Sequence, residues 1–391
     1  MYRMDRQKAL ITASYYASFV AMGISMASLG PTLPALAENT RATLSAISVL
    51  FTARSLGSLI GSVWGGQVYD RLQGNRVMAL MILLMAFLTG LTPVIKGLWL
   101  LAVLLFVNGA VQGVLNIGGN ALLVWVHGPK VGPFMNGLHF FFGIGTFLAP
   151  VIVAQFVARQ GGLLWTYLLL ALIILPTAAV ALLPSPASPA AAQKKSGGRI
   201  DPLLVVLISA VFGLYSGAGL AYSGWIFTYA TEMHLANEVN AAYLTSLYWG
   251  ALTAGRLVAI PLAIRFSPRV ILRADFLGAL VSLLAILLWP RSLLSVMITS
   301  AGLGFALASI YPTTMALSGQ IMTLSGKVTG LFAIGNSLGS MLVPWIIGQF
   351  FESSGPQSMT FVLLIDLLLA LGVLAALGRR TALQSQVSPT V

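Results

Sequence analysis

Four carboxamide side chains recur at every fourth position of one apolar stretch: Asn108, Gln112, Asn116 and Asn120. In a helix, each step of four residues turns about 400°, so the four side chains form a stripe on one face that extends over about 18 Å. A carboxamide offers both a donor and an acceptor, which suits a neutral polyhydroxylated solute better than an ion. We therefore expect the stripe to line a solvated cavity that binds such a solute. Hydrogen bonding between neighbouring helices is the alternative role for each amide.

The next apolar stretch begins with a second polar pair, Asn136 and His139, which lie one helical turn apart. Asn136 adds another amide to the candidate ligands. The imidazole of His139 is a candidate solute ligand or protonatable switch. A structural hydrogen bond from His139 to a neighbouring helix is the alternative.

Aromatic side chains with polar edges form a third group of candidates. An indole or phenol ring can stack on the C–H face of a sugar ring while its N–H or O–H group hydrogen-bonds to the solute. Such residues also anchor helices at the membrane surface, which is the alternative role. The candidates are Tyr222, Trp225 and Trp249, with Asn336 as a further polar candidate.

Three charged residues lie inside apolar stretches: Arg54, Arg256 and Asp366. A charge in contact with lipid is costly, so each of them needs a partner or a solvated surrounding. Either arginine can bind solute, a backbone carbonyl at a helix break, or Asp366, the sole acid deep in a predicted span. We favour the structural role for Arg54.

Residue sets for metal, redox or hydrolytic chemistry are missing from the sequence. The chain has no cysteine, and its three histidines show no metal-ligand spacing. We therefore expect no metal and no cofactor. No nucleophile, acid pair or metal set stands near one membrane face, so we do not expect an enzyme.

The elements that position these residues are long apolar segments. Of the 391 residues, 58% are hydrophobic and only 8% are charged, with a mean hydropathy of +0.92, whereas globular domains carry about 25% charged residues. A helix needs about 20 apolar residues to cross a bilayer. We predict an all-α membrane protein with twelve transmembrane helices, near residues 9–36, 44–69, 77–95, 98–126, 131–158, 163–183, 202–231, 239–264, 270–290, 293–319, 326–351 and 357–378.

The net charge is +12, and the positively charged residues concentrate on one side of the predicted membrane spans. Of the 21 Lys and Arg residues, two lie inside spans and four fall on one side, while the other fifteen fall on the opposite side. Because loops rich in Lys and Arg stay in the cytoplasm, we predict an integral plasma-membrane protein, of the bacterial inner membrane, with both termini cytoplasmic. No nucleic-acid partner is expected. The four residues of the minority side are Arg41, Lys96, Arg159 and Arg291.

The chain divides near its middle. Residues 184–201 are rich in Pro, Ser, Gly and Lys, a composition typical of a solvated linker. We predict a cytoplasmic linker there, between an N-terminal six-helix bundle at 1–183 and a C-terminal six-helix bundle at 202–391.

The two halves carry a weak internal repeat. A shift of 194 positions places Gly30 on Gly224 and Pro150 on Pro344. Membrane transporters often contain such repeats. We predict two pseudo-symmetric bundles, derived from one duplicated unit, in a protein that acts as a monomer.

The turn between the second and third spans combines glycines with an acid and bases, in the segment Gly65-Gly66-Gln67-Val68-Tyr69-Asp70-Arg71-Leu72-Gln73-Gly74-Asn75-Arg76. Asp70 can sit at the positive end of a helix from the other half, and Arg71 can pair with groups beside it. An ordinary cytoplasmic turn is the alternative. The segment resembles the motif Gly-x-x-x-Asp-Arg-x-Gly-Arg-Arg of the major facilitator superfamily, with one extra residue before Gly74.

That resemblance implies the major facilitator fold and a role for the turn. Gly66, Asp70, Arg71 and Arg76 would form a conformational latch that closes the cytoplasmic side in the outward-open state. The corresponding turn at residues 265–269 has no acid, so a second latch is not expected there.

Further segments resemble the fucose-galactose-glucose symporter branch of this superfamily and its sodium-dependent glucose transporter-like family. The more specific ones are Leu138-His139-Phe140 and Gly255-Arg256-Leu257, within similar segments at 54–62, 138–145, 217–226 and 249–257. The resemblance covers nearly the whole chain and implies sugar transport. Relatives are expected to carry carboxylates where this chain has Gly219 and Asn116, so the coupling ion stays open.

We predict transport of a small neutral polar solute, a hexose or related sugar, by alternating access of the two halves. One alternative is an exporter of drugs or amphiphiles, which Met22, Met26 and the run Phe140–Phe142 would suit. A second alternative is a membrane sensor that transports nothing.

Overall fold

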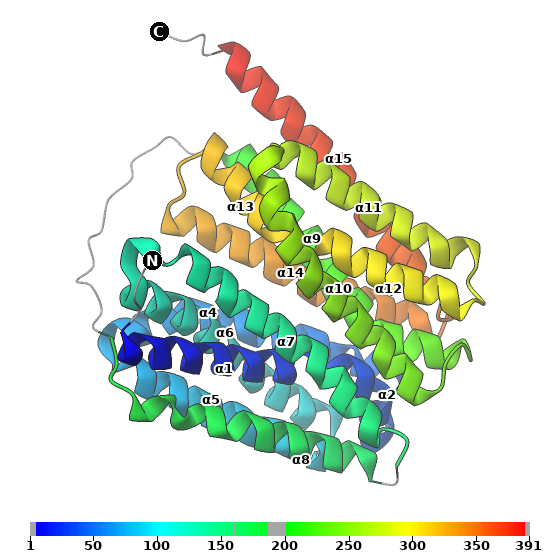
Figure 1. Cartoon of the computed structure of the whole chain (residues 1–391). Helices are drawn as coiled ribbons and strands as arrows, with labels where there is room; N and C mark the ends of the chain where they lie inside the picture. The colour runs from blue at the N-terminus through cyan, green and yellow to red at the C-terminus, as the bar shows by residue number, and fades with distance from the viewer. Residues whose placement is uncertain (1–4, 160, 187–200, 388–391) are drawn as a thin grey trace.

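The computed structural model describes residues 5–159, 161–186 and 201–387, and the regular structure in this part of the chain is all helical (Figure 1). The N-terminal half contains α1 (Arg6–Ala27), α2 (Leu29–Thr40), α3 (Leu44–Ile47), α4 (Val49–Arg71), α5 (Gly74–Leu91), η1 (Thr92–Val94), α6 (Leu98–His127), η2 (Gly128–Lys130), α7 (Gly132–Phe156), α8 (Gly162–Ile174) and η3 (Leu175–Leu182). The C-terminal half contains α9 (Pro202–Glu232), α10 (Glu238–Arg265), α11 (Pro268–Leu288), α12 (Leu293–Leu307), α13 (Ile310–Ile321), α14 (Gly326–Phe351) and α15 (Ser358–Val387).

Twelve segments of the described chain are long and apolar enough to cross a membrane, and each coincides with a predicted span. Several spans contain interruptions that the apolar pattern does not reveal, among them the second, which is divided at Ser48 into α3 and α4. The first span is divided at Ser28 into α1 and α2, and the tenth is divided at Ala308 and Ser309 into α12 and α13. In the sixth span, α8 gives way to the 3-10 helix η3 at Leu175, because Pro176 cannot donate a backbone hydrogen bond.

The two halves form bundles that lie one above the other in Figure 1, with their helices running between the same two ends of the molecule. We call the end where α1 and α9 begin the linker side. The far side is the opposite end, where α2 ends at Thr40 and α9 ends at Glu232.

The halves are joined by hydrogen bonds that repeat with the offset of the sequence repeat. Thr52 on α4 donates to the carbonyl of Met341 on α14 (3.3 Å), and Ser246 on α10 donates to the carbonyl of Phe147 on α7 (3.2 Å). Both the two donors and the two acceptors are 194 positions apart. The contact between the halves therefore has the two-fold character of an isologous interface, in which the same patch is used twice.

A proline lies close to each of these carbonyls. Pro150 lies inside α7 and Pro344 inside α14, each in the turn that follows the accepting carbonyl. A proline lacks the N–H that would bond the carbonyl four residues earlier, which is the carbonyl of Thr146 in α7 and of Ser340 in α14. Accordingly, the carbonyl of Ser340 accepts a hydrogen bond from Ser55 of the other half (3.3 Å).

Two glutamines nearer the far side follow the same symmetry. Gln349 on α14 donates to the Ser45 carbonyl and to the Ser48 hydroxyl, both at 3.2 Å. Its counterpart 194 positions earlier, Gln155 on α7, donates to the Tyr243 hydroxyl at 3.2 Å. These donors extend the symmetric contact to the ends of the helices.

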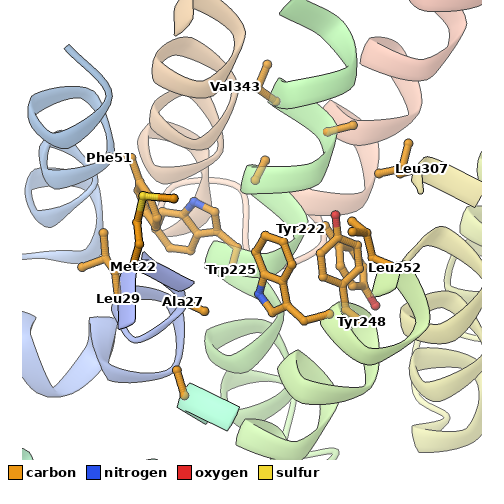
Figure 2. Packing of buried hydrophobic residues seen from close by; sticks show 14 of the residues in the cluster. Met22, Ala27, Leu29, Phe51, Tyr222, Trp225, Tyr248, Leu252, Leu307 and Val343 are labelled. Carbon is orange, nitrogen blue, oxygen red and sulfur yellow. The ribbon is translucent and has the colours of Figure 1, made fainter. Parts of the chain in front are cut away.

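The glycine pair of the sequence repeat lies at the centre of this contact. A Cβ atom on Gly30 would stand 3.1 Å from Cα of Gly224, so α2 and α9 approach each other backbone to backbone. Figure 2 shows the apolar packing around this point, where Phe51 of the N-terminal half lies near Trp225 of the C-terminal half, with ring centroids 6.1 Å apart.

Hydrogen bonds between the halves run from the far side past the middle of the helices, as far as the contact between Arg256 of α10 and His139 of α7. Within the described part of the chain, no hydrogen bond between the halves lies nearer the linker side than those of Ser55 and Arg256. Further along α4 towards the linker side, a Cβ atom on Gly66 would meet no atom within 4 Å. Among the described residues, the halves are thus hydrogen-bonded to each other on the far side but not at the linker-side ends of their helices, and we call the far side closed and the linker side open in this sense.

Inside the N-terminal bundle, α4 and α6 approach so closely that glycine is required at their contact. A Cβ atom on Gly61 would lie 1.9 Å from the carbonyl oxygen of Ala110, and one on Gly113 would lie 2.2 Å from that of Ser58. Small residues are the usual means by which membrane helices reach such distances. The two helices therefore form one rigid pair.

Gly61→Ala should destabilise the protein, because the added methyl group meets backbone atoms that cannot move aside. We expect a loss of at least about 2 kcal/mol in the free energy of unfolding, measured by thermal and denaturant unfolding of the detergent-purified protein. Gly66→Ala on the same helix is the matched control and should unfold like the wild type, since its Cβ atom meets open space. Equal stability of the two variants would refute the close contact of α4 and α6.

Candidate functional site

The predicted amide stripe on α6 divides into two parts with different surroundings. Asn108 and Gln112 are buried inside the N-terminal bundle. Gln112 Nε2 donates to Asn108 Oδ1 (2.8 Å) and to Ser25 Oγ (3.2 Å), and Ser25 lies 3.2 Å from the hydroxyl of Thr89. This network joins α6 to α1 and α5. In this conformation, Asn108 and Gln112 therefore form hydrogen bonds within the bundle and are not accessible to a solute.

The other two amides lie nearer the linker side and are accessible. Asn116 is exposed and Asn120 is half-buried, and Asn120 Nδ2 donates to the Asn116 carbonyl (2.7 Å) and to Asn116 Oδ1 (3.1 Å). On the helix surface, Asn116 stands between Gly113, which packs on α4, and Gly119, whose Cβ atom would lie 2.2 Å from the ring of Phe19 on α1. The pair therefore faces the opening between α1 and α4.

Asn136 and His139 lie on the linker-side part of α7, as Asn116 and Asn120 do on α6. Asn136 is exposed, and the half-buried ring of His139 meets Phe19 edge-on, with centroids 6.1 Å apart. Arg256 of the C-terminal half donates from Nη1 to the carbonyl of His139 at 3.2 Å. This arginine thus joins the halves on the linker-side parts of α7 and α10.

Two of the three predicted aromatic ligands are buried with their polar groups satisfied. The hydroxyl of Tyr222 lies 2.7 Å from that of Ser300, and Trp225 Nε1 donates to the carbonyl of Pro344 at 2.9 Å. The third, Trp249, is only 6% exposed, and its indole N–H has no hydrogen-bond partner among the described residues. Asn336 on α14 is half-buried, and its carbonyl accepts a hydrogen bond from Ser216.

The three predicted intramembrane charges occupy separate places. Arg54 is buried, and its Nη1 donates at 2.7 Å to the carbonyl of Met26, beside the interruption of the first span. Asp366 on α15 is 4% exposed, and its Oδ2 has no partner in the described structure. The prediction omitted a further carboxylate, Asp275 on α11, which accepts a hydrogen bond from Ser309 at the interruption of the tenth span. Its place near a turn hid it from a search for deep charges.

The residues of the predicted latch lie at the open linker side. Asp70, Arg71 and Arg76 are all exposed, and none of them forms an ion pair within the described chain. Helix α4 ends at Arg71, directly after Asp70. The turn is therefore free of the other half in this conformation.

The sequence pattern of the Major Facilitator Superfamily matches residues 15–344. The chain belongs to this superfamily. It is 32% identical over 375 residues to sodium-dependent glucose transporter 1A of Mus musculus, which covers 85% of this chain and 88% of the mouse protein. It is also 30% identical over 373 residues to sodium-dependent glucose transporter 1 of Homo sapiens, covering 85% of this chain and 72% of the human one.

Solved structures of this superfamily share the fold. The nucleoside transporter NupG, crystallised as a mutant, has a TM-score of 0.76 at 13% identity, covering 96% of this chain and 99% of that one. A bacterial homologue of the human lysosomal transporter Spinster, in an inward-facing and occupied conformation, has a TM-score of 0.77 at 12% identity, covering 99% and 100%. The predictions of a major facilitator fold and of a transporter rather than an enzyme are thus confirmed, as is the resemblance to the sodium-dependent glucose transporters.

Within this major facilitator protein, the two parts of the stripe should respond differently to truncation. Gln112→Ala removes buried hydrogen bonds and leaves partners unsatisfied, so it should lower the free energy of unfolding by about 1–3 kcal/mol. Asn116→Ala should leave unfolding unchanged and weaken solute binding by roughly tenfold, the effect of one or two lost hydrogen bonds. Thermal unfolding with and without sugar measures both effects. Unchanged sugar binding by Asn116→Ala would remove this residue from the site.

Proposed function

We propose that this chain carries a small neutral polar solute, a hexose or related sugar, across the membrane by alternating access of its two halves. The accessible amides Asn116, Asn120 and Asn136 carry the proposal, because they lie on the linker-side parts of α6 and α7, and Phe19 of α1 lies against both Gly119 of α6 and the ring of His139 of α7. Donor-and-acceptor groups of this kind match sugar hydroxyls. The names of the mouse and human relatives, which are glucose transporters, support the same class of solute.

The buried candidates take part, in our proposal, in a different step. Trp225 and Trp249 lie at the closed contact between the halves, whereas Tyr222 lies behind them inside the C-terminal half, beside Tyr248 (Figure 2). When the halves separate on the far side, the edge of this aromatic group becomes available to a solute that arrives from that side. Asn108, Gln112 and Asn336 complete the set that we assign to the solute path.

We further propose that the linker side faces the cytoplasm and that the protein acts as a monomer in the plasma membrane, as in a bacterial inner membrane. The distribution of the 21 Lys and Arg residues supports this orientation, since only four of them fall in far-side turns. The conformation described here is then inward-open.

In the outward-open state we propose that Asp70 and Arg71 engage the other half. Asp70 stands at the end of α4, at the level where α14 begins in the C-terminal half. A carboxylate near a helix N-terminus is stabilised by the partial positive charge of the helix. The latch would therefore favour closure of the cytoplasmic side.

Asp70→Asn should shift the population towards the inward-open state by about two- to fivefold, the factor that corresponds to about 0.3–1 kcal/mol of helix-dipole interaction. The natural chain has no cysteine, so single reporters are simple to place. Labelling of Val63→Cys, on the linker-side part of α4, should become faster, and labelling of Ser48→Cys, buried at the far side, should become slower. Unchanged rates at both positions would count against the latch.

Energy coupling is the point at which we expect this chain to differ from its named relatives. The predicted first, fourth, seventh and tenth spans contain no Asp or Glu; they are residues 9–36, 98–126, 202–231 and 293–319. At Gly219 a Cβ atom would stand 3.0 Å from the hydroxyl of Tyr248, so this tyrosine occupies the space that a side chain there would use. Uphill transport needs a group whose ion occupancy differs between the two states. We propose facilitated diffusion, with at most a pH dependence through His139.

In proteoliposomes, glucose uptake should stop at equal concentrations inside and outside, with or without a sodium gradient. The physical reason is that no carboxylate on the four central spans couples ion binding to the change of state. Radiolabelled sugar uptake measures this outcome, and replacement of sodium by potassium is the control. Accumulation above equilibrium that requires sodium would overturn the proposal.

Export of amphiphilic compounds is the second candidate function. It is favoured by the phenylalanine run on α7, where Phe141 stacks on Tyr16 of α1 with ring centroids 4.8 Å apart. Stabilisation of the purified protein by amphiphilic cations, with no response to any hexose, would select this function instead.

A further inference from the structure

A small cavity lies at the closed contact between the two halves. Its wall includes Arg54 from α4 of the N-terminal half and Trp249 from α10 of the C-terminal half. The backbone of Gly30 and Gly224, which meet across the halves, forms another part of it. The cavity has room for one particle about the size of a water molecule and cannot hold a hexose.

The first unusual feature of this cavity is an uncompensated charge. Arg54 is 7% exposed, and within the described chain no carboxylate lies within 4 Å of its guanidinium group. The single hydrogen bond that the structure gives this side chain runs from Nη1 to the Met26 carbonyl, so the other N–H groups of the fork have no protein acceptor among the described residues. A buried charge without a counter-charge is costly in a membrane protein.

The second feature is independent of the first and comes from the other half. Trp249 Nε1 is buried without an acceptor among the described residues, although a buried indole N–H normally finds one. Guanidinium and indole groups donate and never accept. The donors of Arg54 and of Trp249 therefore belong to the wall of one cavity. The hydroxyl of Ser223, also in this wall, donates to the carbonyl of Leu220 at 3.3 Å.

We propose that this cavity binds a small monatomic anion, chloride being the abundant one, between Arg54 and Trp249. An anion accepts hydrogen bonds from both side chains and also neutralises the guanidinium charge. A water molecule accepts the same hydrogen bonds but supplies no charge. The site is separate from the accessible amides of α6 and α7, and the inference holds whichever solute the protein carries.

The anion also has a conformational role, because its two donors come from different halves. When the far side opens, α4 and α10 separate and the paired donors no longer converge on one point. A ligand that binds one conformation more tightly shifts the population towards it. Bound chloride therefore stabilises the conformation that is closed on the far side.

Thermal unfolding of the purified full-length protein in chloride, bromide or gluconate at constant ionic strength tests the site. Chloride and bromide should raise the unfolding temperature in a saturable manner relative to gluconate. Arg54→Gln should weaken the apparent chloride affinity by roughly 10- to 100-fold, the effect of losing hydrogen bonds from a charged donor. Trp249→Phe should weaken it by less, and Trp225→Phe, whose indole N–H already bonds Pro344, is the matched control that should keep the chloride response.

A second measurement remains informative even where a variant is unstable. In otherwise wild-type protein, chloride should slow labelling of Ser48→Cys at the far side, whereas gluconate should not. Crystals grown in bromide should show one anomalous peak between Arg54 and Trp249. The same unfolding temperature and labelling rate in chloride and gluconate would overturn the proposal and indicate that water fills the cavity, as would an equal chloride response in Arg54→Gln.

Discussion

A backbone carbonyl inside a membrane must find a donor, because lipid offers none. In this protein Pro344 removes the helical donor of the Ser340 carbonyl and the hydroxyl of Ser55 in the opposite half replaces it, while the neighbouring carbonyl of Met341 and the carbonyl of Phe147 near Pro150 also accept hydrogen bonds from hydroxyl groups of the opposite half. The rest of the closed far side depends on this exchange, since it fixes how α4 lies against α14 and how α10 lies against α7. The prolines thus make the backbone itself part of the contact between the halves, and sequence symmetry provides the contact twice.

The same chemistry keeps this contact reversible. Within the described chain the halves are joined by hydrogen bonds from hydroxyl, amide and guanidinium groups and by close packing of glycines, and the one ion pair, between Asp201 and Arg380, lies inside the C-terminal half. Each neutral hydrogen bond contributes about 1 kcal/mol. A set of such bonds can hold one conformation and still be exchanged for another when a solute binds the two states differently.

Most of the fold could be predicted because spans follow from apolar length and the two halves follow from a repeated spacing. Residue spacing placed the α6 amides on one face, but it could not show that Asn108 and Gln112 meet Ser25 and Thr89, which belong to distant parts of the chain. The interruption at Ser28 also escaped prediction, because apolar residues continue through it. The offset that relates Gly30 to Gly224 also relates Thr52 to Ser246 and Gln155 to Gln349, so a search for polar residues at that spacing would have found the contact between the halves.

The glycine contacts of α4 and α6 have a mechanical consequence. Backbones that touch at Gly61 and Gly113 leave no compressible side-chain layer between the two helices. Thr52 of α4 bonds the other half at the far side, and Asn116 of α6 faces the open side. Because α4 and α6 are in backbone contact, these two residues belong to one rigid pair of helices. A displacement of one end of this pair therefore moves the other end as well, and a solute bound at the amides, as we propose, would act on the far side without any change in the shape of the helices themselves.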